Sequence, residues 1–82
     1  MALEKRKLYE IEWMDHFSHE GFFNTDLSDF DTDAYFITTI GYYIGQNSNY
    51  IFLAHSLTNT NQCADIMAVL KKVMVGEPRE LT

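Results

Sequence analysis

The chain has 82 residues and a formal net charge of −6, with 46% hydrophobic and 15% aromatic residues. A chain of this length forms a single domain, 1–82, and its hydrophobic content excludes an intrinsically disordered protein. The acidic balance argues against direct binding to nucleic acid, which relies on Lys and Arg to neutralise phosphates. Three of the six basic residues, Lys5, Arg6 and Lys7, lie together near the N-terminus, where we expect a solvated, frayed end.

Targeting signals and cysteine content both indicate a cytoplasmic protein. The first residues lack the apolar core of a signal peptide. No apolar run approaches the roughly 20 residues needed to cross a bilayer. Cys63 is the single cysteine, so it forms no internal disulfide. We therefore expect a cytoplasmic protein without a membrane-spanning segment.

The first predicted element is a strand from Lys7 to Met14. Apolar and charged residues alternate along it with the period of a half-buried strand. The apolar side carries Tyr9, Ile11 and Trp13, and the opposite side carries Glu10 and Glu12.

Residues 15–33 break this alternation and are predicted to form a long connection. The connection is acidic, and it also holds enough apolar residues to pack across one end of a barrel. A short helix within it, capped by Thr25 or Asp26, is the alternative. The aspartates are Asp26, Asp29, Asp31 and Asp33, and the apolar residues are Phe17, Phe22, Phe23, Leu27 and Phe30.

The next elements form the clearest hairpin in the chain. Residues 35–44 are rich in aromatic and β-branched residues, which favours a strand. Gly41 within this strand predicts a bulge or sharp bend. Residues 45–49 are typical of a turn, and residues 50–56 of the returning strand. A second polar turn is predicted over residues 58–62.

The segment from Cys63 to Val75 has two interpretations. Its apolar residues fall at helical spacing, and Gly76 and Pro78 would end a helix. This gives an α+β alternative with a C-terminal helix over residues 61–75. The same residues also divide into two strands, 65–70 and 73–75, joined by a tight turn at Lys71 and Lys72.

The order of the motifs resembles a group of small, uncharacterised phage and prophage proteins. The resemblance rests on Ile11-Glu12-Trp13-Met14-Asp15, Gly21-Phe22, Thr39-Ile40-Gly41-Tyr42-Tyr43-Ile44, the run from Tyr50 to Leu57, the run from Asp65 to Val73, and Arg79-Glu80-Leu81. It covers nearly the whole chain apart from the aspartate-rich connection. The chain departs from the pattern in lacking a proline near Leu70 and a second tryptophan near Phe22.

This resemblance implies a mainly β fold, a small five-stranded SH3-like or Sm-like barrel with the long loop after its first strand. It also favours the two-strand interpretation of the ambiguous segment. It implies a phage or prophage source and carries no established activity or catalytic residue.

Two acidic or histidine-containing motifs suggest ion binding. His16 and His19 lie three residues apart and would supply zinc ligands on a helical turn, with His55 as a further ligand. Their spacing falls short of a standard zinc signature, so no metal cofactor is predicted. The aspartates 29, 31 and 33 resemble the start of a calcium loop, but the sixth and twelfth positions hold Ala34 and Ile40 instead of Gly and Glu. Asp29, Asp31 and Asp33 are therefore expected to form a solvated acidic loop. The alternative is a negatively charged binding surface that imitates nucleic acid or meets a basic partner.

The aromatic residues exceed what one face of a small barrel can bury. The remainder is expected to form an exposed patch of the kind that marks an interface. Open edge strands also favour pairing between subunits, which predicts a homo-oligomer. Trp13, Tyr42, Tyr43 and His55 are the candidate binding residues on this surface.

Catalysis is not expected. Cys63 and His55 have the chemistry of a nucleophile and base, but nothing orients them as a pair. The leading hypothesis is a non-enzymatic phage-type protein that self-associates and binds a host or phage protein. The alternative is an oligomer that sequesters a small ligand such as a nucleotide signal. A metal-dependent hydrolase using His16 and His19 is the third hypothesis.

Overall fold

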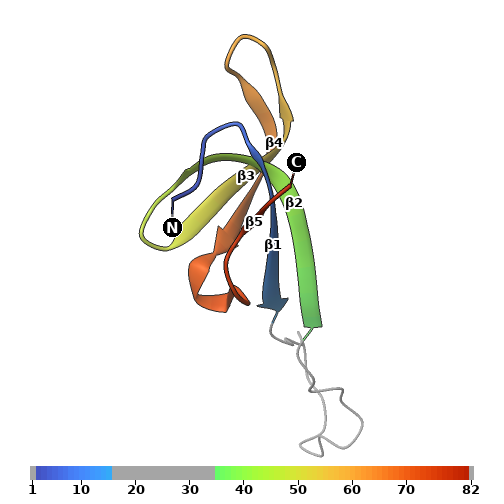
Figure 1. Cartoon of the computed structure of the whole chain (residues 1–82), viewed down its shortest axis with the longest axis vertical. Coiled ribbons are helices and arrows are strands. Elements are labelled where there is room, and N and C mark those ends of the chain that lie inside the picture. The colour runs from blue at the N-terminus through green and yellow to red at the C-terminus, as the bar shows by residue number, and fades with distance from the viewer. Residues whose placement is uncertain (1, 16–34, 82) are drawn as a thin grey trace, which may run out of the picture.

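A computed structural model describes residues 2–15 and 35–81. Their strands form one antiparallel sheet with the order β4-β3-β2-β1-β5 (Figure 1). The prediction of a mainly β protein is thereby confirmed. The predicted connection, residues 15–33, lies outside the described residues except for Asp15, which ends the first strand, and its alternative short helix lies outside them too. The elements are β1 (Leu8–Asp15), β2 (Tyr35–Gln46), β3 (Tyr50–Leu57), β4 (Cys63–Leu70), the 3-10 turn η1 (Lys71–Val73) and β5 (Arg79–Glu80).

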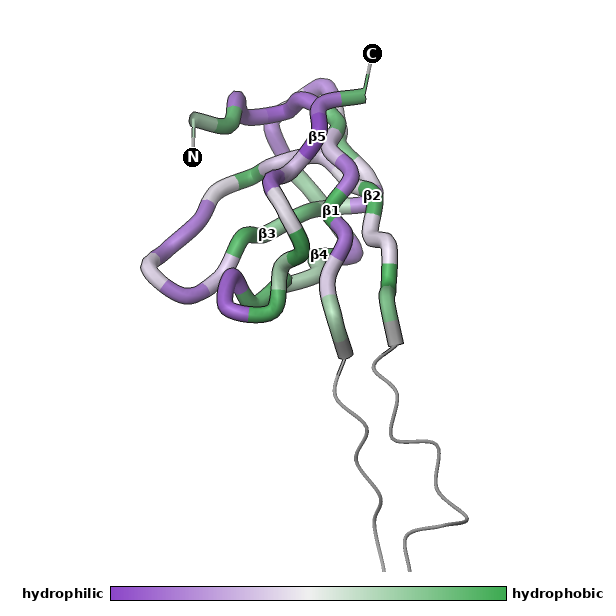
Figure 2. The backbone as a smooth tube through the Cα atoms, turned by 60° about the horizontal axis from the view of Figure 1, so that its bottom comes forward, coloured by the Kyte–Doolittle hydropathy of each residue, from purple (hydrophilic) through white to green (hydrophobic). Residues whose placement is uncertain are grey.

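The core is built from the inward sides of four strands. Hydrophilic and hydrophobic residues alternate along β1, as Figure 2 shows. Successive side chains of a strand point to opposite faces, so this alternation buries one side of it. The buried side chains of β1 to β4 meet in one cluster, so the sheet curls around its inner face. The cluster contains Tyr9, Ile11, Tyr43, Ile51, Leu53 and Val69.

Gly41 lies in β2 with no room for a side chain against β3. A Cβ atom at this position would lie 2.8 Å from Leu53 Cβ and 3.1 Å from the Ala54 carbonyl oxygen. The missing side chain therefore permits a close approach of two strands, one of the reasons for glycine within a strand. The bulge predicted at Gly41 lies instead between Tyr43 and Gly45, where the pairing of β2 with β3 shifts register.

Replacing Gly41 with Ala should destabilise the fold by about 1–3 kcal/mol, the usual range for an overpacked core. The added methyl group would meet Leu53 Cβ and backbone, and neither is the flexible end of a side chain. Urea unfolding followed by circular dichroism measures this change. Thr38→Ala, an exposed substitution in the same strand, is the control and should change stability much less. Equal stability of Gly41→Ala and the wild type would contradict the close-packing argument.

The alternative C-terminal helix over residues 61–75 is wrong, and the predicted strand 65–70 is confirmed within β4. Cys63 to Leu70 form a strand paired with β3, from Tyr50↔Leu70 to Leu57↔Cys63. The segment forms a strand despite its helical spacing, because pairing satisfies the backbone hydrogen-bonding groups of β3 and buries Val69 against Ile51. Propensity yields to tertiary context in such segments.

The second predicted strand, 73–75, is also wrong in detail. Residues Lys71–Val73 form a 3-10 turn, and Met74 makes a single β-bridge with Trp13. The last strand is Arg79–Glu80, which pairs with Glu10 and Tyr9 of β1. Gly76, at a φ of 74°, interrupts the segment between the bridge and β5. The sheet order accordingly places β5 beside β1, as the strand labels in Figure 1 show.

Candidate functional site

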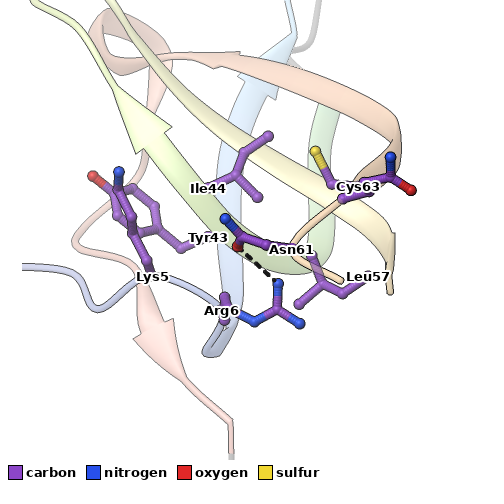
Figure 3. A pocket seen from close by; sticks show the side chains of 8 residues that line it. Lys5, Arg6, Tyr43, Ile44, Leu57, Asn61 and Cys63 are labelled. Carbon is purple, nitrogen blue, oxygen red and sulfur yellow. Dashed lines mark hydrogen bonds between the residues drawn. The ribbon is translucent and has the colours of Figure 1, made fainter. Parts of the chain in front are cut away.

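A surface cavity lies between the N-terminal segment and the β3–β4 hairpin. Its volume is about 420 Å³. Figure 3 shows side chains from three parts of the chain around it. These are Lys5 and Arg6 before β1, Tyr43 and Ile44 in β2, and Leu57, Asn61, Gln62 and Cys63 in or between β3 and β4.

The N-terminal segment is held in place by backbone hydrogen bonds. Arg6 N donates to Tyr43 O at 2.8 Å, and Tyr43 N donates to Lys7 O at 2.9 Å. Glu4 N donates to the Tyr9 hydroxyl at 2.8 Å. The expectation of a frayed N-terminal end is therefore wrong, since these bonds fix the segment beside β2, although Lys5, Arg6 and Lys7 are solvent-exposed as expected.

Arg6 connects the two sides of this cavity. Its backbone has a φ of 69°, in the left-handed region that non-glycine residues seldom adopt. Its Nη2 donates to Thr58 O at 2.7 Å, and its Nη1 donates to Asn61 Oδ1 at 3.4 Å. The dashed line in Figure 3 marks the second bond. Both acceptors are uncharged, so they orient the guanidinium without neutralising it.

The cavity has the opposite charge to the chain as a whole. Its described lining holds two cations and no carboxylate. The ion pair found among residues 2–15 and 35–81 joins Arg79 and Glu10, away from the cavity. Lys5 and Arg6 thus form a locally positive site in a chain of net charge −6.

The second cavity lies between the ends of β1 and β4 and has a volume of about 240 Å³. It is more apolar than the first. Trp13 Nε1 donates a 2.9 Å hydrogen bond to Thr39 Oγ1 beside this cavity, and Thr39 is the buried polar residue of the described core. The lining consists of Trp13, Met14, Met67, Ala68, Val69, Leu70 and Val73.

Thr39→Val should lower the free energy of unfolding by about 1–2 kcal/mol, because a partly buried indole N–H would lose its acceptor. Trp13 is the single tryptophan, so its fluorescence reports both unfolding and the change in its surroundings. Urea titration followed at the tryptophan emission maximum makes the measurement. Thr38→Val, on the exposed side of the same strand, is the matched control. If both valine variants lose the same stability, the hydrogen bond contributes nothing specific.

The four candidate binding residues do not form one site. Tyr43 is buried, and its ring meets Tyr9 edge to face at a centroid distance of 6.1 Å. Tyr42, the adjacent residue in β2, points to the opposite face, as strand geometry requires. Trp13 lines the second cavity, and His55 is exposed on β3. The structure therefore separates the residues that the sequence grouped as stacking partners.

The ion-binding candidates lie mainly outside the described residues. His16, His19, Asp29, Asp31 and Asp33 all fall in the part of the chain between 16 and 34. Across the residues that the structure describes, no three His, Cys, Asp or Glu side chains group as metal ligands.

Cys63 and His55 do not lie opposite one another in the pairing of β3 with β4. Cys63 pairs with Leu57 across the β3–β4 hairpin, and both Cys63 and His55 are exposed. Among the described hydrogen bonds, none joins their side chains.

The helices in the described portion include none long and apolar enough to cross a membrane.

Sequence reasoning missed Lys5 and Arg6 as site residues. A basic cluster before a predicted strand is usually a solvated end. The signal that was available is the contrast between three consecutive cations and a chain with 12 acidic residues. The basic cluster contacts the β3–β4 turn through Arg6 and Asn61, which are 55 residues apart in the sequence.

Comparison with protein-family models, with curated proteins and with solved structures finds no match to this chain.

Proposed function

We propose that this chain is a non-catalytic binding protein that self-associates through the free edge of β4. The observation that carries the proposal is the exposure of this strand. Its first six residues, 63–68, are all exposed although five of them are apolar. β4 also ends the sheet, so one row of its backbone N–H and C=O groups has no neighbouring strand in the described sheet.

Apolar side chains stand on both faces of β4. Ile66 is 55% exposed and Met67 is 40% exposed. Adjacent residues of a strand point to opposite faces, so β4 exposes an apolar side chain on each face. A strand with one solvated face usually carries polar residues on that face. Met67 also lines the apolar cavity beside Trp13, which extends the uncovered surface inward.

Apart from Asp65, which is charged and has a φ of 58°, the edge lacks the features that normally prevent strand pairing. Natural edge strands are protected by lysine, proline, bulges or short length. β4 has eight residues, with neither lysine nor proline, and Asp65 is its one charged residue. The opposite edge differs, because β5 has two residues, Arg79 and Glu80, and both are charged.

A second copy of the chain is the occupant that fits this edge best. Antiparallel pairing of β4 with itself would satisfy the same row of backbone groups on both chains and cover apolar residues on each. Two chains of charge −6 repel one another, and β4 carries little of that charge. Like-charge repulsion between two chains is therefore weak at this edge.

A barrel of the SH3-like or Sm-like kind is the finer fold that we propose with this function. Convergence of the inward side chains of β1 to β4 in one cluster supports it, as does a cavity lined by both β1 and β4. Binding of a host or phage protein in the cytoplasm is part of this proposal. It is supported by the aromatic excess and the acidic connection of the sequence, together with the phage or prophage source that the resemblance implies.

Ile66→Lys should weaken self-association about tenfold or more, since a lysine on the edge would place charge against its symmetry copy. Native mass spectrometry and light scattering after size exclusion, across a range of protein concentrations, measure the change. Ile66 is exposed, so the variant should keep the wild-type circular dichroism spectrum.

Phe36→Lys is the matched control for this experiment. Phe36 is 63% exposed and lies on β2, an interior strand of the sheet. It changes surface hydrophobicity and charge in the same direction without touching the edge. A wild-type chain that stays monomeric at the highest concentration, or an Ile66→Lys variant that associates like Phe36→Lys, would refute the β4 interface.

A further inference from the structure

We propose that the cavity between the N-terminal segment and the β3–β4 hairpin binds a small phosphomonoester, with Lys5 and Arg6 holding the phosphate. The organic part of the ligand would lie against Ile44 and Leu57. This site shares Cys63 with β4 and no residue with the cavity beside Trp13.

Arg6 is oriented for an anion before any ligand arrives. Thr58 O and Asn61 Oδ1 accept two of its five N–H donors. Its remaining donors have no partner among the described residues. A guanidinium held by neutral acceptors keeps its full charge, and charge-assisted bonds to phosphate are among the strongest hydrogen bonds in proteins.

Lys5 adds a second positive charge to the lining of the cavity. The described lining has no carboxylate to neutralise either cation. The net charge of −6 repels anions at long range, but salt screens charges beyond about 8–10 Å. Within the cavity the two nearby cations therefore dominate the field.

The remaining walls suit an organic group rather than a free ion. Ile44 and Leu57 are apolar, and the Asn61 and Gln62 side chains bring amide donors and acceptors to the same space. The volume of about 420 Å³ lies within the range of roughly 300–1,000 Å³ typical of small-ligand sites.

The same observations favour a small molecule over a nucleic-acid strand. A strand presents successive phosphates and needs a track of cations. Beyond this cavity the described chain offers few, because the whole sequence has six basic against 12 acidic residues. A ligand with a single phosphate and a single organic group therefore fits this cavity and its two cations better than a nucleic-acid strand does.

Cys63 supplies a built-in reporter for the test. It lines the cavity, is exposed, and is the single cysteine of the chain. Its alkylation by iodoacetamide, an uncharged reagent, would be timed by mass spectrometry with adenosine monophosphate, phenyl phosphate, adenosine or inorganic phosphate present. Isothermal titration calorimetry would give the affinities of the same four probes.

We expect saturable binding of adenosine monophosphate or phenyl phosphate, with alkylation of Cys63 slowed at least about twofold at saturation. Lys5→Gln and Arg6→Gln should each weaken this binding about tenfold, because each removes a charge-assisted contact. Lys7→Gln removes the same charge from a residue outside the lining and should leave the affinity unchanged. Repeating the alkylation in Ile66→Lys separates shielding by the ligand from shielding by a second chain.

Three results would overturn the proposal. The first is the absence of saturable binding by both phosphomonoesters at millimolar concentration. The second is equal affinity in Lys5→Gln, Arg6→Gln and the Lys7→Gln control, which would remove the role of the cations. The third is binding of adenosine or inorganic phosphate as tight as that of adenosine monophosphate, because the site would then recognise only one part of the ligand.

Discussion

The curvature of the sheet depends on the contact between Gly41 and Leu53. Leu53 is fully buried, and its Cβ occupies the space that a side chain at position 41 would need. This close approach lets β2 and β3 coil, so that residues of β1 such as Ile11 reach Ile51 and Val69 across the inner face. A flatter sheet would separate these side chains and leave a core this small exposed to water.

A small, strongly curved core also determines which surfaces stay uncovered. The core cluster takes two residues from β1, but β4 contributes Val69 alone. Most of β4 therefore extends beyond the core with its apolar side chains exposed. The exposure of Ile66 and Met67 follows from the position of the strand at the end of the sheet, and it creates the edge on which the proposed self-association rests.

Local pattern was sufficient to predict part of this fold. The alternation around Tyr9 and Ile11 gave β1, and the composition around Gly45 gave the first hairpin, to within two residues at each boundary. It was insufficient for residues 63–75, where helical spacing competed with pairing to β3. The structure of that segment depends on contacts such as Ile51↔Val69, which join distant parts of the sequence. The cavity around Arg6 was missed for the same reason, since its other wall comes from the β3–β4 hairpin.

Residues with positive backbone φ angles lie at the cavity beside that hairpin. The non-glycine residues with positive φ among the described residues are Arg6, Asn61 and Asp65. Left-handed backbone costs roughly 1–2 kcal/mol at a residue such as Arg6, whereas Asn and Asp adopt it more readily. Two of the three line the same cavity and are joined by the hydrogen bond from Arg6 Nη1 to Asn61 Oδ1. Strained residues concentrate where surrounding contacts hold a site in one geometry. Arg6 takes its positive φ as the third residue of the turn from Glu4 to Lys7, which the 3.3 Å hydrogen bond from Lys7 N to Glu4 O closes, so this turn places the Arg6 side chain against the β3–β4 hairpin.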